Sequence, residues 1–163
     1  MKYFLCLLLL LPSITVFASD SFTIYLVRHA EKEKNTKDPI LTQCGERRAE
    51  QIAEILSTAN INHVYSTNYK RTLATATPFA QQQNITIEQY SPRELTLLSQ
   101  QLLAAKNNSL VVGHSNTTPQ LAALLSDTQV KEISEKDYRG LYLVQVNGKA
   151  KSFTLLTLPL TCP

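Results

Sequence analysis

Short apolar runs alternate with segments of helical spacing from residue 22 to residue 125 of this 163-residue chain. Runs at 22–27, 61–65, 85–90 and 110–112 are rich in β-branched or aromatic residues and predict strands. Between and after them, apolar residues three and four apart predict helices that begin near Thr42, Tyr69, Pro92 and Pro119. This alternation predicts an α/β fold, a three-layer α/β/α sandwich around a mainly parallel sheet.

The C-terminal pattern differs from the rest of the chain. An apolar run over 141–146 is followed by Asn147-Gly148 and then by a second run over 150–158. Asn-Gly between two such runs predicts a hairpin with a type I′ turn, and therefore an antiparallel edge to the sheet. The sequence has no internal repeat and no low-complexity linker, so residues 19–163 are expected to form a single domain.

The first 18 residues have the pattern of a cleavable signal peptide. Lys2 forms a short positive region, residues 5–11 form an apolar region that is too short to span a bilayer, and Val16-Phe17-Ala18 is a typical cleavage site. Cys6 lies inside the apolar region, so we do not expect a lipoprotein anchor there. The expected mature protein begins after Ala18, is periplasmic or secreted, and has no stable membrane anchor.

The charge and the cysteine content bear on the possible binding partners and on disulfide formation. The formal net charge is +3 with basic and acidic residues intermixed, which gives no support for binding to nucleic acid. Two cysteines remain after the expected cleavage, Cys44 and Cys162. In an exported protein they can form a disulfide between the C-terminal tail and the loop before the first helix, or remain as two free thiols.

Arg28-His29-Ala30 directly follows the first predicted strand. In open α/β sheets, ligands bind at the carboxyl ends of the strands, and that is where these side chains are expected. A neighbouring arginine opposes protonation of the imidazole, and a neutral imidazole is a nucleophile. Arginine is also the side chain best shaped to hold a phosphoryl group.

Two further junctions between a strand and a helix carry similar residues. Arg71 falls in the first turn of the helix after the second strand, where a cation is unfavourable unless an anion neutralises it; Asn68 is the expected N-cap. Gly113-His114 follows the fourth strand, with Thr118 as the expected cap and Pro119 at the first helical position. Two arginines and two histidines are therefore expected at one edge of the sheet.

From about Phe22 to Leu125, this pattern resembles the histidine phosphatase superfamily, the phosphoglycerate-mutase-like proteins. The opening motif Arg-His-Gly has its counterpart in Arg28-His29-Ala30, the Arg-Thr helix motif in Arg71-Thr72, and the Gly-His motif in Gly113-His114. The small branch with Arg-His-Ala-Glu-Lys is the most similar. Ala30 in place of glycine requires an ordinary backbone conformation at that position.

The resemblance implies a phosphomonoesterase that acts through a phosphohistidine on His29. Arg28 and Arg71 would bind the phosphoryl oxygens of a small phosphorylated substrate, and His114 would donate to the same group. Asn116 would contribute its backbone amide to substrate binding or act as an N-cap. A phosphomutase of the same chemistry and a non-catalytic phosphate-binding protein are the alternatives; the short connections favour hydrolysis over mutase activity.

The proton donor is left open between two carboxylates. Glu94 follows the third strand, where relatives place a glutamate, but Ser91-Pro92-Arg93-Glu94 also has the pattern of a capping box, which we favour. Glu31 lies two residues beyond His29 and is the rival acid, unless it only pairs with an arginine.

No cofactor or metal is expected. The chain has three histidines and no H-x-H, H-E-x-x-H or C-x-x-C spacing. His63, inside the second predicted strand, is interpreted as a structural histidine.

Overall fold

The computed structural model describes residues 21–34 and 37–162. The predicted signal peptide over residues 1–18 lies outside the described residues, so its prediction stands untested. Within the described part of the chain, no helix has the length and apolar character needed to cross a bilayer.

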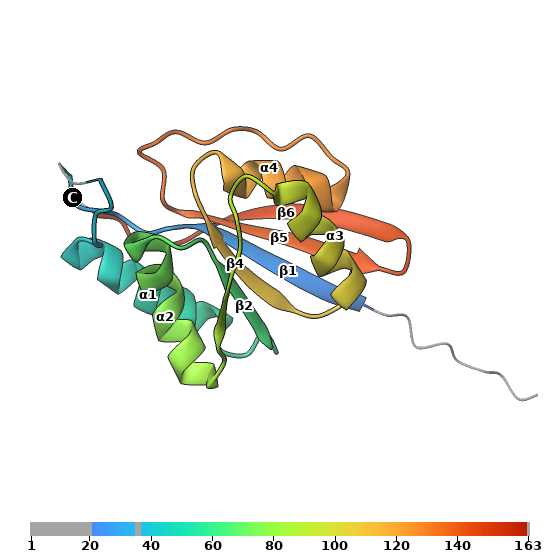
Figure 1. Cartoon of the computed structure of the whole chain (residues 1–163), viewed down its shortest axis with the longest axis horizontal. Coiled ribbons are helices and arrows are strands. Elements are labelled where there is room, and N and C mark those ends of the chain that lie inside the picture. The colour runs from blue at the N-terminus through green and yellow to red at the C-terminus, as the bar shows by residue number, and fades with distance from the viewer. Residues whose placement is uncertain (1–20, 35–36, 163) are drawn as a thin grey trace, which may run out of the picture.

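The elements alternate along the chain as the apolar pattern predicts (Figure 1). They are β1 (Ser21–Arg28), α1 (Gln43–Leu56), β2 (His63–Ser66), α2 (Lys70–Gln83), β3 (Ile87–Gln89), α3 (Leu95–Ala105), β4 (Ser109–Gly113), α4 (Thr117–Ser126), β5 (Gly140–Asn147) and β6 (Ala150–Thr157).

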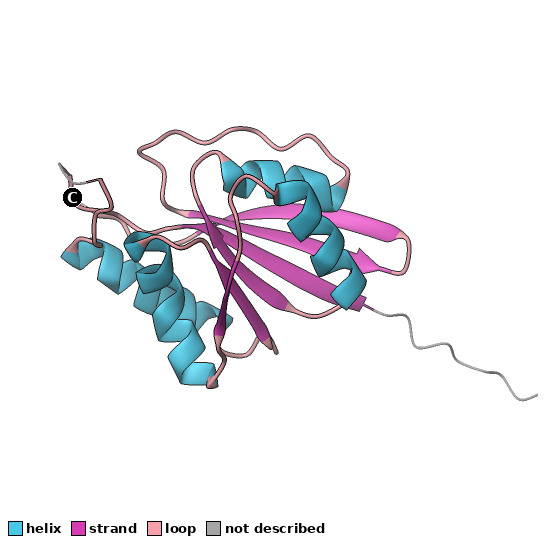
Figure 2. Ribbon diagram, in the orientation of Figure 1, coloured by secondary structure: helices cyan, strands magenta, loops and turns pink. Residues whose placement is uncertain are grey.

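One six-stranded sheet with the order β3-β2-β4-β1-β5-β6 forms the middle layer. The first four strands in that order are parallel, and β5 and β6 add an antiparallel edge. Helices α1 and α2 lie on one face, and α3 and α4 lie on the other (Figure 2). The predicted α/β fold with a mainly parallel sheet and an antiparallel hairpin edge is confirmed.

The period of two along the strands explains the two cores. In β1, Phe22, Ile24 and Leu26 pack in the core beneath α3 and α4, whereas Val27 packs in the core beneath α1 and α2. In β4, the neighbouring side chains of Val111 and Val112 are likewise divided between the two cores. In a sheet covered by helices on both faces, the side chains that point to either face are buried. Its strands are therefore nearly continuous apolar runs in the sequence.

Several predicted boundaries are wrong by a few residues. The third strand is shorter than predicted and its helix begins at Leu95 rather than at Pro92. The hairpin turn has Gly148 and Lys149 at its centre, since Asn147 pairs with Ala150. Of these central residues only Gly148 has a positive φ, +59°, which fits a type II′ turn and not the predicted type I′.

Candidate active site

The carboxyl ends of β1, β2 and β4 lie side by side at one edge of the sheet. The residues after these ends line a cavity of about 370 Å³ that contains His29, Arg71 and His114. The other lining residues are Lys32, Tyr69, Pro92, Arg93, Ser115, Asn116, Thr117 and Glu135. The expected gathering of these histidines and Arg71 is therefore present in the fold; their catalytic roles stay predictions.

His29 lies in the wall of this cavity with 3% of its surface exposed. Its Nδ1 is 2.8 Å from the carbonyl oxygen of Ala30, an atom that only accepts hydrogen bonds, so Nδ1 carries the proton. Nε2 of the neutral ring then has a free lone pair. Burial, helped by the charges of Arg28 and Arg71, lowers the pKa of His29 to about 3, although the bond to Ala30 raises it.

His114 faces His29, with 5.6 Å between the ring centroids. Thr72 Oγ1 donates to a backbone carbonyl oxygen, that of Thr67 at 2.8 Å, so it accepts from Thr67 Oγ1 at 3.0 Å. Thr67 Oγ1 in turn accepts from His114 Nε2, which is 3.0 Å away. Nδ1 of His114 is then unprotonated and accepts from Arg71 Nη2 at 3.4 Å. Burial, together with Arg71 and Arg28, lowers the pKa of His114 to about 4.

Arg28 is 2% exposed and is held by the segment that connects α4 to β5, residues 127–139. Its Nη1 donates to the carbonyl oxygens of Ser134 and Asp137, and its Nη2 donates to Glu135 Oε2 at 2.8 Å. The guanidinium carbon also lies 4.0 Å above the ring of Tyr138. Arg28 is not itself a lining residue of the cavity; Glu135 connects it to the cavity.

Arg71 lies in the first turn of α2, as predicted, and the anion that neutralises it comes from this chain. Asp38 Oδ1 is 3.4 Å from Arg71 Nη1 and also accepts from the backbone N–H of Lys70 at 3.1 Å. The N-cap position is Tyr69 and not the predicted Asn68, because Asp38 supplies the capping oxygen from another segment. The ring of Tyr69 contacts both Arg71 and His114.

The two arginines nonetheless have unused donors. Among the described residues, the buried side-chain nitrogens without a hydrogen-bond partner are the Nε atoms of Arg28 and Arg71. A buried guanidinium N–H without a partner is costly, and an oxyanion is the ligand that satisfies it best. The two orphaned N–H groups are therefore consistent with a site that binds an anion.

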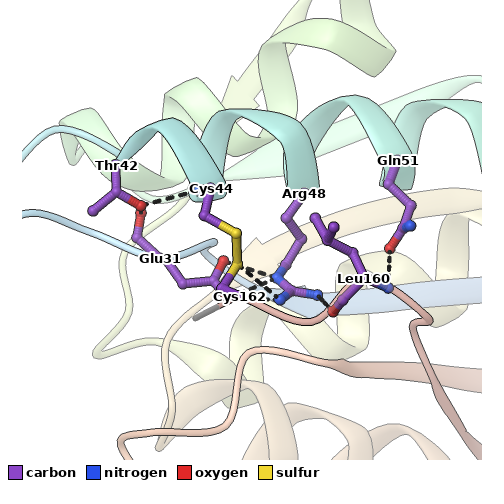
Figure 3. Close-up of a disulfide and its surroundings, with 8 residues drawn as sticks. Glu31, Thr42, Cys44, Arg48, Gln51, Leu160 and Cys162 are labelled. Carbon is purple, nitrogen blue, oxygen red and sulfur yellow. Dashed lines mark hydrogen bonds and ion pairs between the residues drawn. A yellow bond between two sulfur atoms is a disulfide. The ribbon is translucent and has the colours of Figure 1, made fainter.

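Glu31 is held away from the histidines by an arginine that the sequence pattern did not single out. Arg48 donates from Nε and Nη2 to both carboxylate oxygens of Glu31, at 2.6–3.0 Å. Arg48 is 1% exposed and its Nη1 donates to the carbonyl oxygen of Leu160 (Figure 3). The alternative that Glu31 pairs with an arginine is thus realised, and Glu31 lines a neighbouring cavity rather than that of His29.

Cys44 and Cys162 form a disulfide beside this ion pair (Figure 3). The bridge joins residues 118 positions apart and ties the C-terminal tail to the first turn of α1 rather than to the loop before it, because the helix begins one residue before Cys44. Arg48 Nη2 also lies 3.5 Å from Cys162 Sγ. The disulfide, one of the two alternatives that the sequence leaves open, therefore covers the Arg48–Glu31 pair.

Glu94 is exposed and does not line the cavity of His29. The favoured capping box is wrong as well: Glu94 occupies the N-cap position itself and makes no side-chain cap bond. Ser91 Oγ accepts from the backbone N–H of Arg93, and the Ser91 carbonyl oxygen accepts from that of Glu94. These two bonds form a turn, which delays the helix to Leu95.

Helix α4 begins two residues earlier than predicted. Its N-cap position is Asn116, without a side-chain cap bond, and not Thr118. Thr117 Oγ1 instead accepts from the backbone N–H of His114 at 2.9 Å, which fixes the turn that carries the histidine. Gly113 is needed here for packing, because a Cβ would lie 2.9 Å from Thr117 Oγ1 and 3.0 Å from the Tyr90 hydroxyl.

The sequence pattern did not reveal several site residues, among them Glu135, Tyr138, Tyr69 and Asp38. Glu135 and Tyr138 lie in a segment without apolar periodicity, more than 100 positions from Arg28, and no local pattern marks them. Ala30 has no positive φ, in agreement with the ordinary backbone required of it. His63, at the start of β2, bonds Glu88 and Asn107 away from the cavity.

Potential metal ligands gather at one place in the described residues, where Glu31 lies near the sulfurs of Cys44 and Cys162. These sulfurs form a disulfide and the carboxylate is bound by Arg48, so the group does not fit a metal ion as it stands.

Parts of the sequence are similar to a known protein family and to a curated protein. The model of the histidine phosphatase superfamily (branch 1) matches residues 24–92. A probable phosphoglycerate mutase, GpmB, of Proteus mirabilis is 42% identical over 65 residues, which are 36% of this chain and 30% of that protein. The chain thus matches less than a third of the length of this curated relative.

Solved structures share the fold at low sequence identity. The protein histidine phosphatase SixA in complex with tungstate has a TM-score of 0.70 and 16% identity, over 83% of this chain and 96% of that one. A mycobacterial glucosyl-3-phosphoglycerate phosphatase has a TM-score of 0.66 and 12% identity, over 86% of this chain and 100% of that one.

Proposed function

This chain belongs to the histidine phosphatase superfamily, and we propose that it hydrolyses small phosphate monoesters through a covalent phosphohistidine on His29. Its relatives are phosphatases or mutases. The observation that carries the proposal is the tautomer of His29, in which the Ala30 carbonyl holds the proton on Nδ1 and leaves Nε2 as the nucleophile. The lowered pKa keeps that lone pair free at neutral pH.

The surroundings of His29 supply the remaining chemistry. In phosphoryl transfer, charge spreads over the oxygens of the transferred group, so catalysis depends on positioning and on cations around that group. Arg71 lines the cavity, and its free Nε donor is suited to those oxygens. Arg28 is bound to Glu135 and does not line the cavity, so its guanidinium reaches those oxygens once a substrate displaces Glu135. His114 faces His29, and the negative charge of a bound phosphoryl group favours its protonated form, in which Nδ1 donates to that group. We assign no metal or cofactor to the reaction.

Hydrolysis rather than mutase activity is favoured by the architecture around the cavity. A mutase has to keep a phosphorylated intermediate away from water while it is reoriented. Residues 67–69 and 114–116 are short connections at the cavity, as predicted, whereas the connections over residues 29–42 and 127–139 are longer than predicted. Among the described residues, no named helix or strand lies within these two longer connections, and the cavity volume of about 370 Å³ suits a small substrate.

Export is the second part of this proposal. It rests on the signal-peptide pattern over residues 1–18 and is supported by the Cys44–Cys162 disulfide, because such bonds persist in oxidising compartments. Expression of the full chain, followed by fractionation and N-terminal sequencing, tests it. We expect mature protein that starts at Ser19 outside the cytoplasm; an uncleaved cytoplasmic chain would contradict export.

The nucleophile is tested with His29→Ala on the mature protein. We expect this variant to lose turnover and the acid-labile phosphoenzyme seen after rapid quenching, while its thermal stability changes little. His63→Ala is the matched control, since His63 lies outside the cavity, and it should retain both. Normal hydrolysis by His29→Ala would overturn the mechanism, and activity that a chelator removes and a divalent ion restores would favour a metal hydrolase instead. Tight phosphate binding without turnover would identify a non-catalytic binding protein.

A further inference from the structure

Glu135 is the one acidic residue among the described residues that line the cavity of His29. Its carboxylate accepts from Arg28 Nη2 at 2.8 Å and from the hydroxyl of Ser115, the residue after His114. The side chain is 76% exposed, so the carboxylate lies at the mouth of the cavity rather than at its base.

The geometry of phosphoryl transfer indicates what a carboxylate at the position of Glu135 can do. The attacking and leaving atoms lie roughly in line on opposite sides of phosphorus. His29 is 3% exposed and attacks from the buried wall, so the leaving oxygen points away from it, toward the mouth. A proton donor for that oxygen is therefore required on the side where Glu135 lies.

The other carboxylates near the site lie outside the cavity. Both oxygens of Glu31 accept from Arg48, and Asp38 accepts from the backbone of Lys70 and from Arg71 Nη1 at the start of α2. Neither lines the cavity of His29, and neither does Glu94.

We propose that Glu135 is the general acid and base of this site. In the first step, His29 Nε2 forms a bond to phosphorus, the bond from phosphorus to the leaving oxygen breaks, and the carboxylic acid of Glu135 gives its proton to that oxygen to release an alcohol. In the second step, water attacks phosphorus, the Glu135 carboxylate takes a proton from it, and the N–P bond breaks with its electron pair returned to Nε2. Glu135 ends the second step protonated, as it began the first; it takes up this proton from solvent when the substrate binds and returns it when phosphate leaves.

The charges around Glu135 allow this change of protonation. In the unliganded site, the Ser115 hydroxyl, Arg28 and Lys32 lower the pKa of the Glu135 carboxyl. A phosphate ester brings negative charge next to this carboxyl and competes with it for Arg28, and both effects raise its pKa. Substrate binding therefore favours the protonated acid that the first step needs.

This inference rests on the proposed function, and Glu135→Gln tests it separately. The variant is compared with wild type on an alkyl phosphate and on 2,4-dinitrophenyl phosphate, whose leaving group needs no proton. For the alkyl ester we expect kcat/KM to fall by about 10²–10⁴-fold. For the activated ester, kcat/KM should change by less than about tenfold, while kcat falls and phosphoenzyme accumulates because water has lost its base.

Matched variants show whether the effect belongs to this residue. Glu132→Gln changes an exposed glutamate of the same segment and should leave both substrates unaffected. Glu94→Gln and Asp38→Asn test the neighbouring carboxylates and should produce no dependence on the leaving group. If Glu135→Gln lowers kcat/KM equally for both substrates, or leaves kcat/KM for the alkyl ester unchanged, the proposed role of Glu135 is wrong. If wild type forms no phosphoenzyme, the proposed function itself is wrong.

Discussion

Two ion pairs of the same composition flank the loop that carries His29, and they differ in their surroundings. Arg48 and Glu31 are 1% and 16% exposed, with three hydrogen bonds between them and a disulfide above them. Arg28 and Glu135 are 2% and 76% exposed, with one bond between them, at the mouth of the cavity. In each pair the arginine is buried, so the accessibility of the glutamate distinguishes the two.

That difference determines what each pair can do. A carboxylate enclosed by Arg48 and the tail can neither reach a substrate nor exchange protons readily, but it fixes the chain two residues after the nucleophile. The α1 helix adds to this fixation, because the Glu31 carbonyl oxygen accepts from the backbone N–H of Thr42 at 2.9 Å. A carboxylate in contact with water can change its charge at low cost. We infer that the first pair is structural and that the second is part of the chemistry.

Breaking the buried pair has the largest expected effect. Arg48→Met leaves the Glu31 carboxylate without its partner, and we expect the free energy of unfolding to fall by about 3–5 kcal/mol. Urea unfolding at pH 7 measures it, with the neighbouring exposed Arg47→Met as control. Glu135→Gln should cost about 0–1 kcal/mol, because Glu135 is exposed and Arg28 keeps its bonds to the carbonyl oxygens of Ser134 and Asp137. Similar losses from both pairs would contradict the division into a structural and a chemical pair.

Removal of the disulfide has the next largest effect. Cys44→Ala combined with Cys162→Ala releases a loop of 118 residues, for which we expect a loss of about 2–5 kcal/mol of unfolding free energy. The loss should not add to that of Arg48→Met, because both changes release the tail that holds Arg48 through Leu160. Strict additivity would show that the bridge and the ion pair stabilise the protein independently.

The fold and the core of the site could be predicted because they depend on local signals. Each strand is an apolar run, and parallel strands bring the residues after them to one edge, which is sufficient to place His29, Arg71 and His114 together. The N-caps of α2 and α4 could not be predicted in the same way. Asn68 and Thr118 are residue types that cap helices well, but neither occupies the N-cap position. Bonds from distant residues, such as that of Asp38 to Lys70, determine where the helices begin.

The sequence leaves open that Glu31 pairs with an arginine, but it identifies neither Arg48 as that arginine nor Glu135 as the partner of Arg28, for a related reason. Arg48 lies one residue before Ala49 on the buried face of α1, where a charge is stable only because Glu31 and the C-terminal tail surround it. Glu135 lies in a polar connection whose path is determined by contacts of Arg28 with Ser134 and Asp137. The contacts of Arg48 with Leu160 and of Arg28 with Glu135 join residues more than 100 positions apart, and such contacts leave no periodicity in the sequence.

The response to mild acid, counted for one histidine and one pH unit, is smaller than the loss of the buried pair or of the disulfide, and it separates the histidines from the Arg28–Glu135 pair. Both His29 and His114 have a folded-state pKa below the ordinary value of 6.5, at about 3 and about 4. Between those values and 6.5 the unfolded chain binds more protons than the folded one, so stability decreases as the pH falls through this range.

Each histidine contributes at most about 1.4 kcal/mol per pH unit to this loss. The Glu135 carboxyl has a pKa below its ordinary value of 4.5, so the stability that it provides is lost only at lower pH, as it becomes protonated in the folded state. Urea unfolding of wild type, His29→Asn and His114→Asn at pH 7, 6 and 5 measures the slopes. Each histidine substitution should reduce the slope of the unfolding free energy against pH above pH 4.5.

Glu135→Gln, measured in the same way, should not reduce this slope. It should increase the slope slightly, because Glu135 raises the pKa of His114. A slope that Glu135→Gln abolishes would assign the mild-acid response to the exposed pair and contradict its origin in the two buried histidines.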